Sequence, residues 1–178
     1  VVVVLMLSIT SLYQTVSAQK QVYYSSDWGE KLPSFPNHLI LKSNVVFVHE
    51  DMTMTCDSAV FNTEENLINA YNNIHIYQDT LHLYGDEFIY DADTKIAEIF
   101  GDTVTLYDNN TTLQTDYMVM DREAQTVRYT THAYIWDEEN TLESELGTYL
   151  IDTKIFEFTK EVKLNSPQVN ILSDSLFY

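Results

Sequence analysis

The hydrophobic and polar positions of this chain repeat at an almost constant interval. Apolar runs begin at positions spaced by 29 or 30 residues, namely Val45, Ile74, Val104, Ala133 and Val162. Each run is followed by a polar turn, a second apolar run and a further pair of short runs. Self-similarity at a period of this size is typical of stacked architectures, in which no unit buries its apolar face alone.

The short apolar runs predict β-strands. They are bounded by polar turns, and several alternate between apolar and polar positions. Met52, Met54 and Cys56 share one predicted face, whereas Thr53 and Thr55 lie on the other. Helical periodicity is weak along the whole chain. We therefore predict an all-β fold of stacked units of about 29 residues, with equivalent strands of successive units side by side in two facing sheets.

The N-terminal residues differ from the repeats. The first nine residues are almost all apolar, and Val16-Ser17-Ala18 has the small-x-small pattern of a cleavage site. This is typical of a secretory signal peptide whose charged start is missing, and a buried first strand is the alternative. The predicted organisation is a signal peptide, a turn-rich lead-in and a repeat domain, at residues 1–18, 19–43 and 44–178.

Composition narrows the class of function. The chain is 45% hydrophobic, which favours a folded protein, and its net charge is −18. A surface this acidic repels phosphate backbones, so we predict no nucleic-acid partner. The single cysteine, Cys56, has no disulfide partner within the chain. No P-loop, HExxH, GxSxG or Rossmann fingerprint occurs, and we expect no enzymatic activity and no cofactor.

Three motifs in a fixed order carry a resemblance to a known family. They are Asn44-Val-Val-Phe-Val-His-Glu50, Met54-Thr-Cys-Asp-Ser-Ala-Val-Phe61 and Asp79-Thr-Leu-His-Leu-Tyr-Gly-Asp86. In these segments the chain resembles the OstA-like family, the periplasmic module related to LptA, LptC and the N-terminal part of LptD. The version that it resembles is that of Bacteroidetes-type bacteria, and the match extends over residues 38–178.

The resemblance implies a twisted, half-open jelly roll, also called a β-taco, that is not an enzyme. It implies transport of lipopolysaccharide, whose lipid A acyl chains lie in an apolar groove, in the periplasm or in association with the outer membrane. Other jelly-roll transport modules, joined through edge strands, and outer-membrane assembly components are the partners implied. The chain departs from the family pattern at Ser43-Asn44 and Asn72-Asn73, which replace Gly-Asn, and at Gly147, where other repeats have Asp.

Ten apolar residues on the predicted inward faces are the candidate groove lining. They are Met52, Met54, Ile74, Ile76, Leu81, Leu83, Val104, Leu106, Met118 and Met120. Acyl chains bind through non-directional contacts worth about 0.8 kcal/mol per buried CH2 group. One alternative is a structural or surface β-solenoid with a filled core. Another is a carbohydrate-processing β-solenoid enzyme, which needs a pair of carboxylates in an aromatic cleft.

Two further sets of polar residues have more than one interpretation. Asp57, Asp86, Asp116 and Asp174 recur with the repeat, and they either cap bends or form a carboxylate row for Ca2+. His75 and His82 flank one turn and could face each other across two strands. No third ligand accompanies them at a metal-site spacing, so cross-strand packing is favoured and we expect no metal site.

Overall fold

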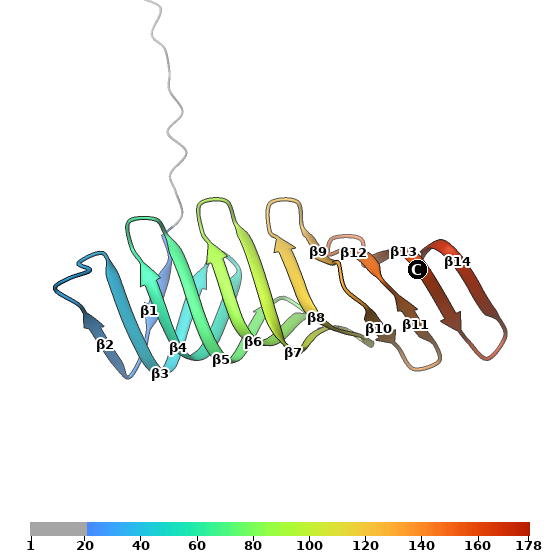
Figure 1. The fold of residues 1–178 in the computed structure, drawn as a ribbon, viewed down its shortest axis with the longest axis horizontal. Helices are drawn as coiled ribbons and strands as arrows, with labels where there is room; N and C mark the ends of the chain where they lie inside the picture. The colour runs from blue at the N-terminus through green and yellow to red at the C-terminus, as the bar shows by residue number, and fades with distance from the viewer. Residues whose placement is uncertain (1–20) are drawn as a thin grey trace, which may run out of the picture.

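The structure is a computed structural model that describes residues 21–178, and this part of the chain forms one antiparallel sheet of fourteen strands (Figure 1). The strands are β1 (Tyr23–Ser25), β2 (Trp28–Lys31), β3 (His38–His49), β4 (Met52–Asn62), β5 (Leu67–Gln78), β6 (Leu81–Asp91), β7 (Ile96–Asp108), β8 (Thr111–Asp121), β9 (Thr126–Tyr129), β10 (Ala133–Trp136), β11 (Thr141–Ser144), β12 (Leu146–Leu150), β13 (Ile155–Asn165) and β14 (Asn170–Phe177). The predicted all-β, repeat-built jelly roll is confirmed. Within these residues no helix has the length and apolar character needed to span a bilayer.

The long strands bend at their middle, so that the sheet folds into two facing leaves. Register shifts mark these bends in β3 to β8 and in β13. Leaf I contains residues 38–42, 58–62, 67–71, 87–91, 96–100, 117–121, 126–129, 146–150, 155–159 and 175–177. Leaf II contains residues 45–49, 52–56, 74–78, 81–85, 104–108, 111–115, 133–136, 141–144, 162–165 and 170–173.

From β3 to β8, neighbouring strands are consecutive along the chain, which differs from the predicted stacking. Strand β5 lies between β4 and β6, and both pairings are antiparallel. Equivalent strands of successive units are therefore separated by one intervening strand. The reason is that two-residue turns, such as residues 50–51 and 79–80, reverse the chain directly into the next strand. The sheet also begins before residue 44, because β1 and β2 both pair with β3.

At the paired bends of β4 and β5, left-handed backbone is combined with a carboxylate. Asn72 and Asn73 have φ values of 63° and 51°, a region that Asn tolerates better than most residues. Asp57, at the bend of the neighbouring strand, accepts a hydrogen bond of 2.7 Å from Asn73 Nδ2. Asp86 likewise accepts a bond of 3.2 Å from the Asp102 backbone N–H. These contacts support the capping interpretation of the aspartate series.

The fourth repeat places Glu145, and not Gly147, at the bend. Glu145 separates β11 from β12, its backbone N–H donates to the Lys160 carbonyl at 3.1 Å, and its carboxylate lies 3.2 Å from His132 Nδ1. Gly147 lies two residues further along, opposite Tyr129. A Cβ atom there would lie 2.5 Å from the Tyr129 ring, so this glycine makes room for a buried aromatic side chain.

Candidate functional site

The ten predicted lining residues all point between the leaves. Each is at most 2% exposed, and all ten belong to one continuous cluster of buried apolar residues. Eight lie on leaf II, whereas Met118 and Met120 lie on leaf I. Their burial agrees with the inward orientation that was expected of their side chains. Their role as the lining of an acyl-chain groove stays a prediction.

Leaf I supplies inward residues that sequence reasoning missed, and many of them are aromatic. They include Ala59, Phe61, Ile68, Ala70, Phe88, Tyr90, Ala97, Ile99, Val127, Tyr129, Tyr149, Phe156 and Phe158, each less than 5% exposed. The sequence indicates some of these inward positions through aromatic residues two positions apart, namely Phe88/Tyr90 and Phe156/Phe158. The bends interrupt the regular alternation of inward and outward side chains, so it cannot be followed from one leaf into the other. In β4, Cys56 is inward before the bend, and the next inward residue is Ala59.

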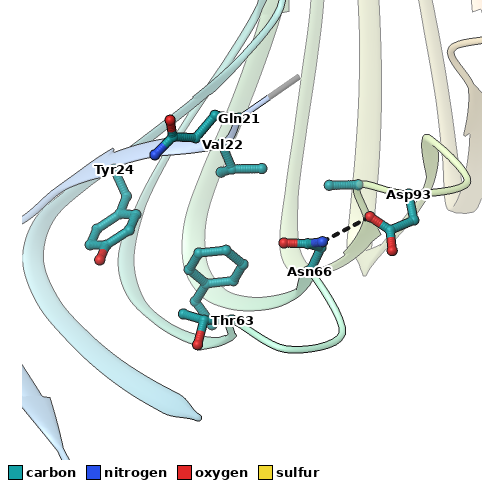
Figure 2. A pocket seen from close by; sticks show the side chains of 8 residues that line it. Gln21, Val22, Tyr24, Thr63, Asn66 and Asp93 are labelled. Atoms are coloured by element: carbon teal, nitrogen blue, oxygen red, sulfur yellow. Dashed lines mark hydrogen bonds between the residues drawn. The ribbon is translucent and has the colours of Figure 1, made fainter. Parts of the chain in front are cut away.

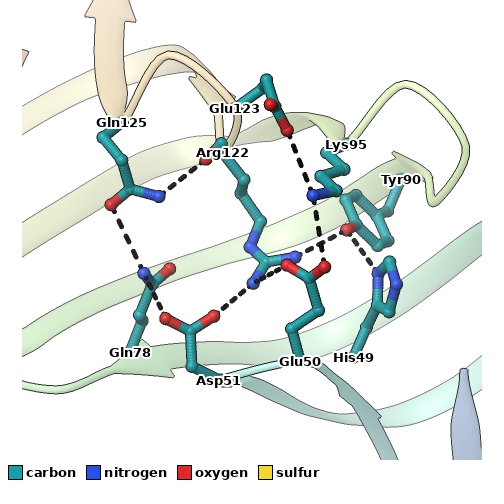
Figure 3. A network of polar contacts seen from close by, with 9 residues as sticks. All are labelled: His49, Glu50, Asp51, Gln78, Tyr90, Lys95, Arg122, Glu123 and Gln125. Carbon is teal, nitrogen blue, oxygen red and sulfur yellow. Dashed lines mark hydrogen bonds and ion pairs between the residues drawn. The ribbon is translucent and has the colours of Figure 1, made fainter. Parts of the chain in front are cut away.

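Opposite the bends, the hairpin turns of the two leaves meet along a line that we call the seam. We call the row of hairpin turns along one leaf its lip. The lip of leaf I consists of residues 63–66, 92–95, 122–125 and 151–154. The lip of leaf II consists of residues 50–51, 79–80, 109–110 and 137–140. Polar side chains from the strand ends and both lips contact one another across this line (Figure 3).

Arg122 is the centre of the first seam cluster. Its side chain is only 1% exposed, although it comes from a turn. The guanidinium lies 2.5 Å from Asp51 and 3.5 Å from Glu50 on the opposite lip, and it donates to the Tyr90 hydroxyl at 3.0 Å. That hydroxyl also lies 2.8 Å from His49 Nδ1. A buried cation thus joins two segments that are 71 positions apart in the sequence.

Two further contacts extend this cluster along the seam. Lys95 lies 3.2 Å from Glu50 on the opposite lip and 3.1 Å from Glu123 on its own. Gln78 Nε2 donates to Gln125 Oε1 at 3.5 Å across the seam. Gln78 Oε1 and Arg122 Nε are buried without a hydrogen-bond partner in the part of the chain that the structure describes.

A second seam cluster surrounds Asp108. Its carboxylate accepts hydrogen bonds from Lys154 Nζ at 2.5 Å, from Thr80 at 2.6 Å and from the Tyr149 hydroxyl. Lys154 and Tyr149 come from leaf I, whereas Asp108 and Thr80 come from leaf II and its lip. Burial acts to raise the pKa of the Asp108 carboxyl, but these hydrogen bonds outweigh it and the pKa lies below its ordinary value.

A pocket of about 410 Å³ opens at the N-terminal end of the seam (Figure 2). One wall is formed by Val22, which directly precedes the edge strand β1, and by Tyr24 on that strand. The other wall is formed by Thr63 and Asn66 of the leaf I lip. Phe61 also lines it and is 4% exposed. The pocket therefore lies against an aromatic ring of the apolar interior, between the N-terminal segment and the leaf I lip.

The histidine pair lies on the outer face of leaf II. His75 Nε2 and His82 Nδ1 are 3.0 Å apart, and the His75 ring stacks on Tyr84 with centroids 4.5 Å apart. Burial and the neighbouring His82 lower the pKa of His75. Among residues 21–178, no three His, Cys, Asp or Glu side chains converge as a metal site. The pair fits the cross-strand packing interpretation.

With this geometry established, comparison with known proteins places the chain in a family. Residues 25–174 match the sequence profile of the family described as OstA-like protein. The chain belongs to the OstA-like family. The OstA-like match includes β2 and the first half of β3, which agrees with their place in the same sheet.

Among solved structures, this OstA-like chain is similar to one described as LptH, the LptA homologous periplasmic component of the conserved lipopolysaccharide transport device from Pseudomonas aeruginosa. The two are 13% identical, with a TM-score of 0.32, over 89% of this chain and 94% of that chain. No curated protein matches the chain.

Proposed function

We propose that this chain is a non-enzymatic periplasmic module that binds lipopolysaccharide through its lipid A acyl chains and takes part in lipopolysaccharide transport to the outer membrane. Membership of the OstA-like family supports this transport role. The observation that carries the proposal is the continuous apolar interior between two leaves that are joined at one side by backbone and at the other by side chains. Such an interior can take up hydrocarbon without exposing it to water.

Export and joining to other modules belong to the same proposal. The signal peptide predicted at residues 1–18 lies outside the described residues, and it would direct the chain to the periplasm. For joining, strand β14 pairs only with β13 among the described strands, and its Leu172 and Phe177 side chains are 81% and 72% exposed. An exposed strand edge of this kind suits pairing with a strand of another jelly-roll module or of an outer-membrane assembly component.

The second candidate is a structural module with a filled core. It is favoured by one specific observation, namely that the ten candidate lining residues are almost completely buried. The two candidates differ in whether the leaves separate to admit a lipid, and this difference can be measured directly.

Photo-crosslinking from the interior tests the proposal. A benzoylphenylalanine at Met54 or Leu83 should crosslink to lipopolysaccharide, because both side chains are fully buried between the leaves. The matched controls are Thr55 and Tyr84, neighbours on the same strands whose side chains point outward. Crosslinking should be seen by mass shift on denaturing gels with anti-lipid A detection.

The outcome separates the two candidates. Crosslinks from the inward positions and none from Thr55 or Tyr84 would support an acyl-chain interior. If folded variants give no adduct at the inward positions, or equal adducts at all four positions, the filled-core candidate is preferred and the carrier is rejected.

A further inference from the structure

The two sides of the interior are closed by different kinds of contact. At the bends the backbone runs continuously from leaf to leaf, as in β4 and β5. At the seam the clusters around Arg122 and Asp108 join the lips through side chains. Opening the bends would break the strands themselves, whereas opening the seam breaks side-chain contacts. The seam is therefore the side of the interior that can open while the sheet stays paired.

The leaf I lip is built to move as one edge. Its turns are linked to one another by backbone hydrogen bonds, from Ala92 to Asn66 at 3.1 Å, from Arg122 to Lys95 at 3.1 Å and from Ile151 at 3.0 Å to the preceding turn. Cations on this edge face carboxylates on the other, in the pairs Arg122 with Asp51 and Lys154 with Asp108. A few ion pairs thus hold a continuous edge in the closed position.

Some buried polar atoms at the closed seam also lack hydrogen-bond partners within residues 21–178. Arg122 Nε and Gln78 Oε1 are buried there without a partner among the described residues. A buried polar atom without a partner carries a desolvation penalty that is removed when water reaches it. This penalty opposes closure and lowers the free-energy difference between the closed and the open seam.

We infer that the seam is a lateral gate: the ion pairs of Arg122 and Lys154 hold the lips together, and acyl chains enter the interior between the lips when these pairs break. This gate rests on the proposed function, because it regulates access to the same interior. It goes further in assigning the route of entry and the residues that control it. Entry along the seam places each chain against the inward residues of both leaves at once.

The gate can be tested by measuring the rate of lipid uptake when the contacts across the seam are weakened or when the seam is crosslinked. The probe is lipid A with one pyrene-labelled acyl chain, delivered from phosphatidylcholine vesicles and followed by stopped-flow fluorescence. The double variant Arg122→Gln/Lys154→Gln should take up the probe about tenfold faster, because each substitution removes charge-assisted hydrogen bonds across the seam. Lys163→Gln is the matched control, since it removes an exposed ion pair with Glu143 within leaf II.

A crosslink across the seam should hold it closed and so has the opposite effect on uptake. This experiment does not require that the Arg122→Gln/Lys154→Gln variant folds. Cysteines at Glu50 and Glu123, whose carboxylates contact the same Lys95 ammonium, are joined by a short cleavable bismaleimide in a Cys56→Ala background. Uptake should slow by at least about tenfold and recover after cleavage of the linker. The matched control joins cysteines at Glu143 and Lys163, which face each other within leaf II and leave the seam free.

The results separate the gate from the function on which it rests. Slow uptake confined to the seam crosslink supports the gate. Normal uptake by the seam-crosslinked protein overturns the gate and leaves the carrier function standing. Failure of the unmodified protein to take up the probe at all overturns the proposed function, and the gate with it.

Discussion

Asp108 shows how one residue can serve both the stability of the fold and the closure of the seam. Its side chain is 1% exposed, and its carboxylate accepts bonds from Lys154, Thr80 and Tyr149. A buried carboxylate is tolerated only when its oxygens are fully paired in this way. Because the pKa of Asp108 lies below the ordinary value of 3.8, the folded protein favours the ionised form more than the unfolded chain does.

This shift gives Asp108 a defined effect on the pH dependence of stability. The stabilisation is complete above the unfolded-state pKa of 3.8 and is lost as the pH falls through the lower folded-state value. Asp108→Asn should therefore lower the free energy of unfolding at neutral pH by about 1.5–3 kcal/mol. It should also flatten the decline of that free energy below about pH 4. Urea unfolding followed by tryptophan fluorescence at each pH measures both effects.

The control for this prediction is Asp79→Asn, which changes an exposed aspartate in a neighbouring turn of the same lip. It should leave the neutral-pH stability nearly unchanged. An Asp108→Asn protein that loses stability in acid as steeply as the wild type would contradict the assignment.

At the scale of the element, each long strand works as two short strands joined by a bend. Left-handed residues recur at these bends, at Ser43-Asn44, Asn72-Asn73 and Lys160-Glu161. They allow one strand to continue from leaf I into leaf II while keeping its hydrogen-bonded neighbours on both sides. Two adjacent left-handed residues thus form the bend in β3, β5 and β13, whereas β4, β6, β7 and β8 bend without them.

Substitutions at Asn72 should reveal how much this conformation contributes. Its φ of 63° disfavours a β-branched residue, so Asn72→Val should lower the free energy of unfolding by about 1–2 kcal/mol. Asn72→Gly should be nearly neutral, because glycine adopts this conformation without steric cost. Asn69→Val is the control, since Asn69 lies in the extended part of β5 where valine is favoured. Equal losses at positions 69 and 72 in chemical denaturation would reject the explanation.

The bends also explain which part of the site could be predicted from sequence. Within a leaf, strict alternation identified Met52, Met54 and Cys56 as inward without further information. Across a bend the phase of alternation shifts, so the same reasoning could not be carried from Cys56 to Ala59 and Phe61. Leaf I was for this reason predicted far less completely than leaf II. The sequence pattern aligns Gly147 with the aspartates of the other repeats, although Glu145 keeps the 29-residue spacing from Asp116.

At the scale of the whole molecule, the seam depends on how the two leaves are offset. Arg122 meets Asp51 although 71 positions separate them, more than two repeats along the chain. No local pattern records that offset, since it results from the accumulated twist of many strands. The period of 29 residues thus predicted the architecture, whereas the contacts that close the interior required the three-dimensional arrangement.

The net charge of −18 is also a property of the whole molecule, and it predicts how stability responds to salt. Mutual repulsion of like charges destabilises the compact state and is screened over about 10 Å at 0.1 M ionic strength. Thermal denaturation should therefore show a higher Tm at about 0.15 M NaCl than at about 0.01 M. A Tm that falls over this range would mean that the attractive pairs at the seam outweigh the general repulsion.

The burial of the interior has a consequence for how firmly the proposed carrier would hold a lipid. Its inward side chains contact one another in one continuous apolar cluster. In the proposed carrier, an incoming hydrocarbon tail would exchange contacts between the leaves for contacts with the leaves, and only the difference between the two would favour retention. A module that regains its own internal contacts when the lipid leaves would release that lipid readily, as the proposed transfer between joined modules requires.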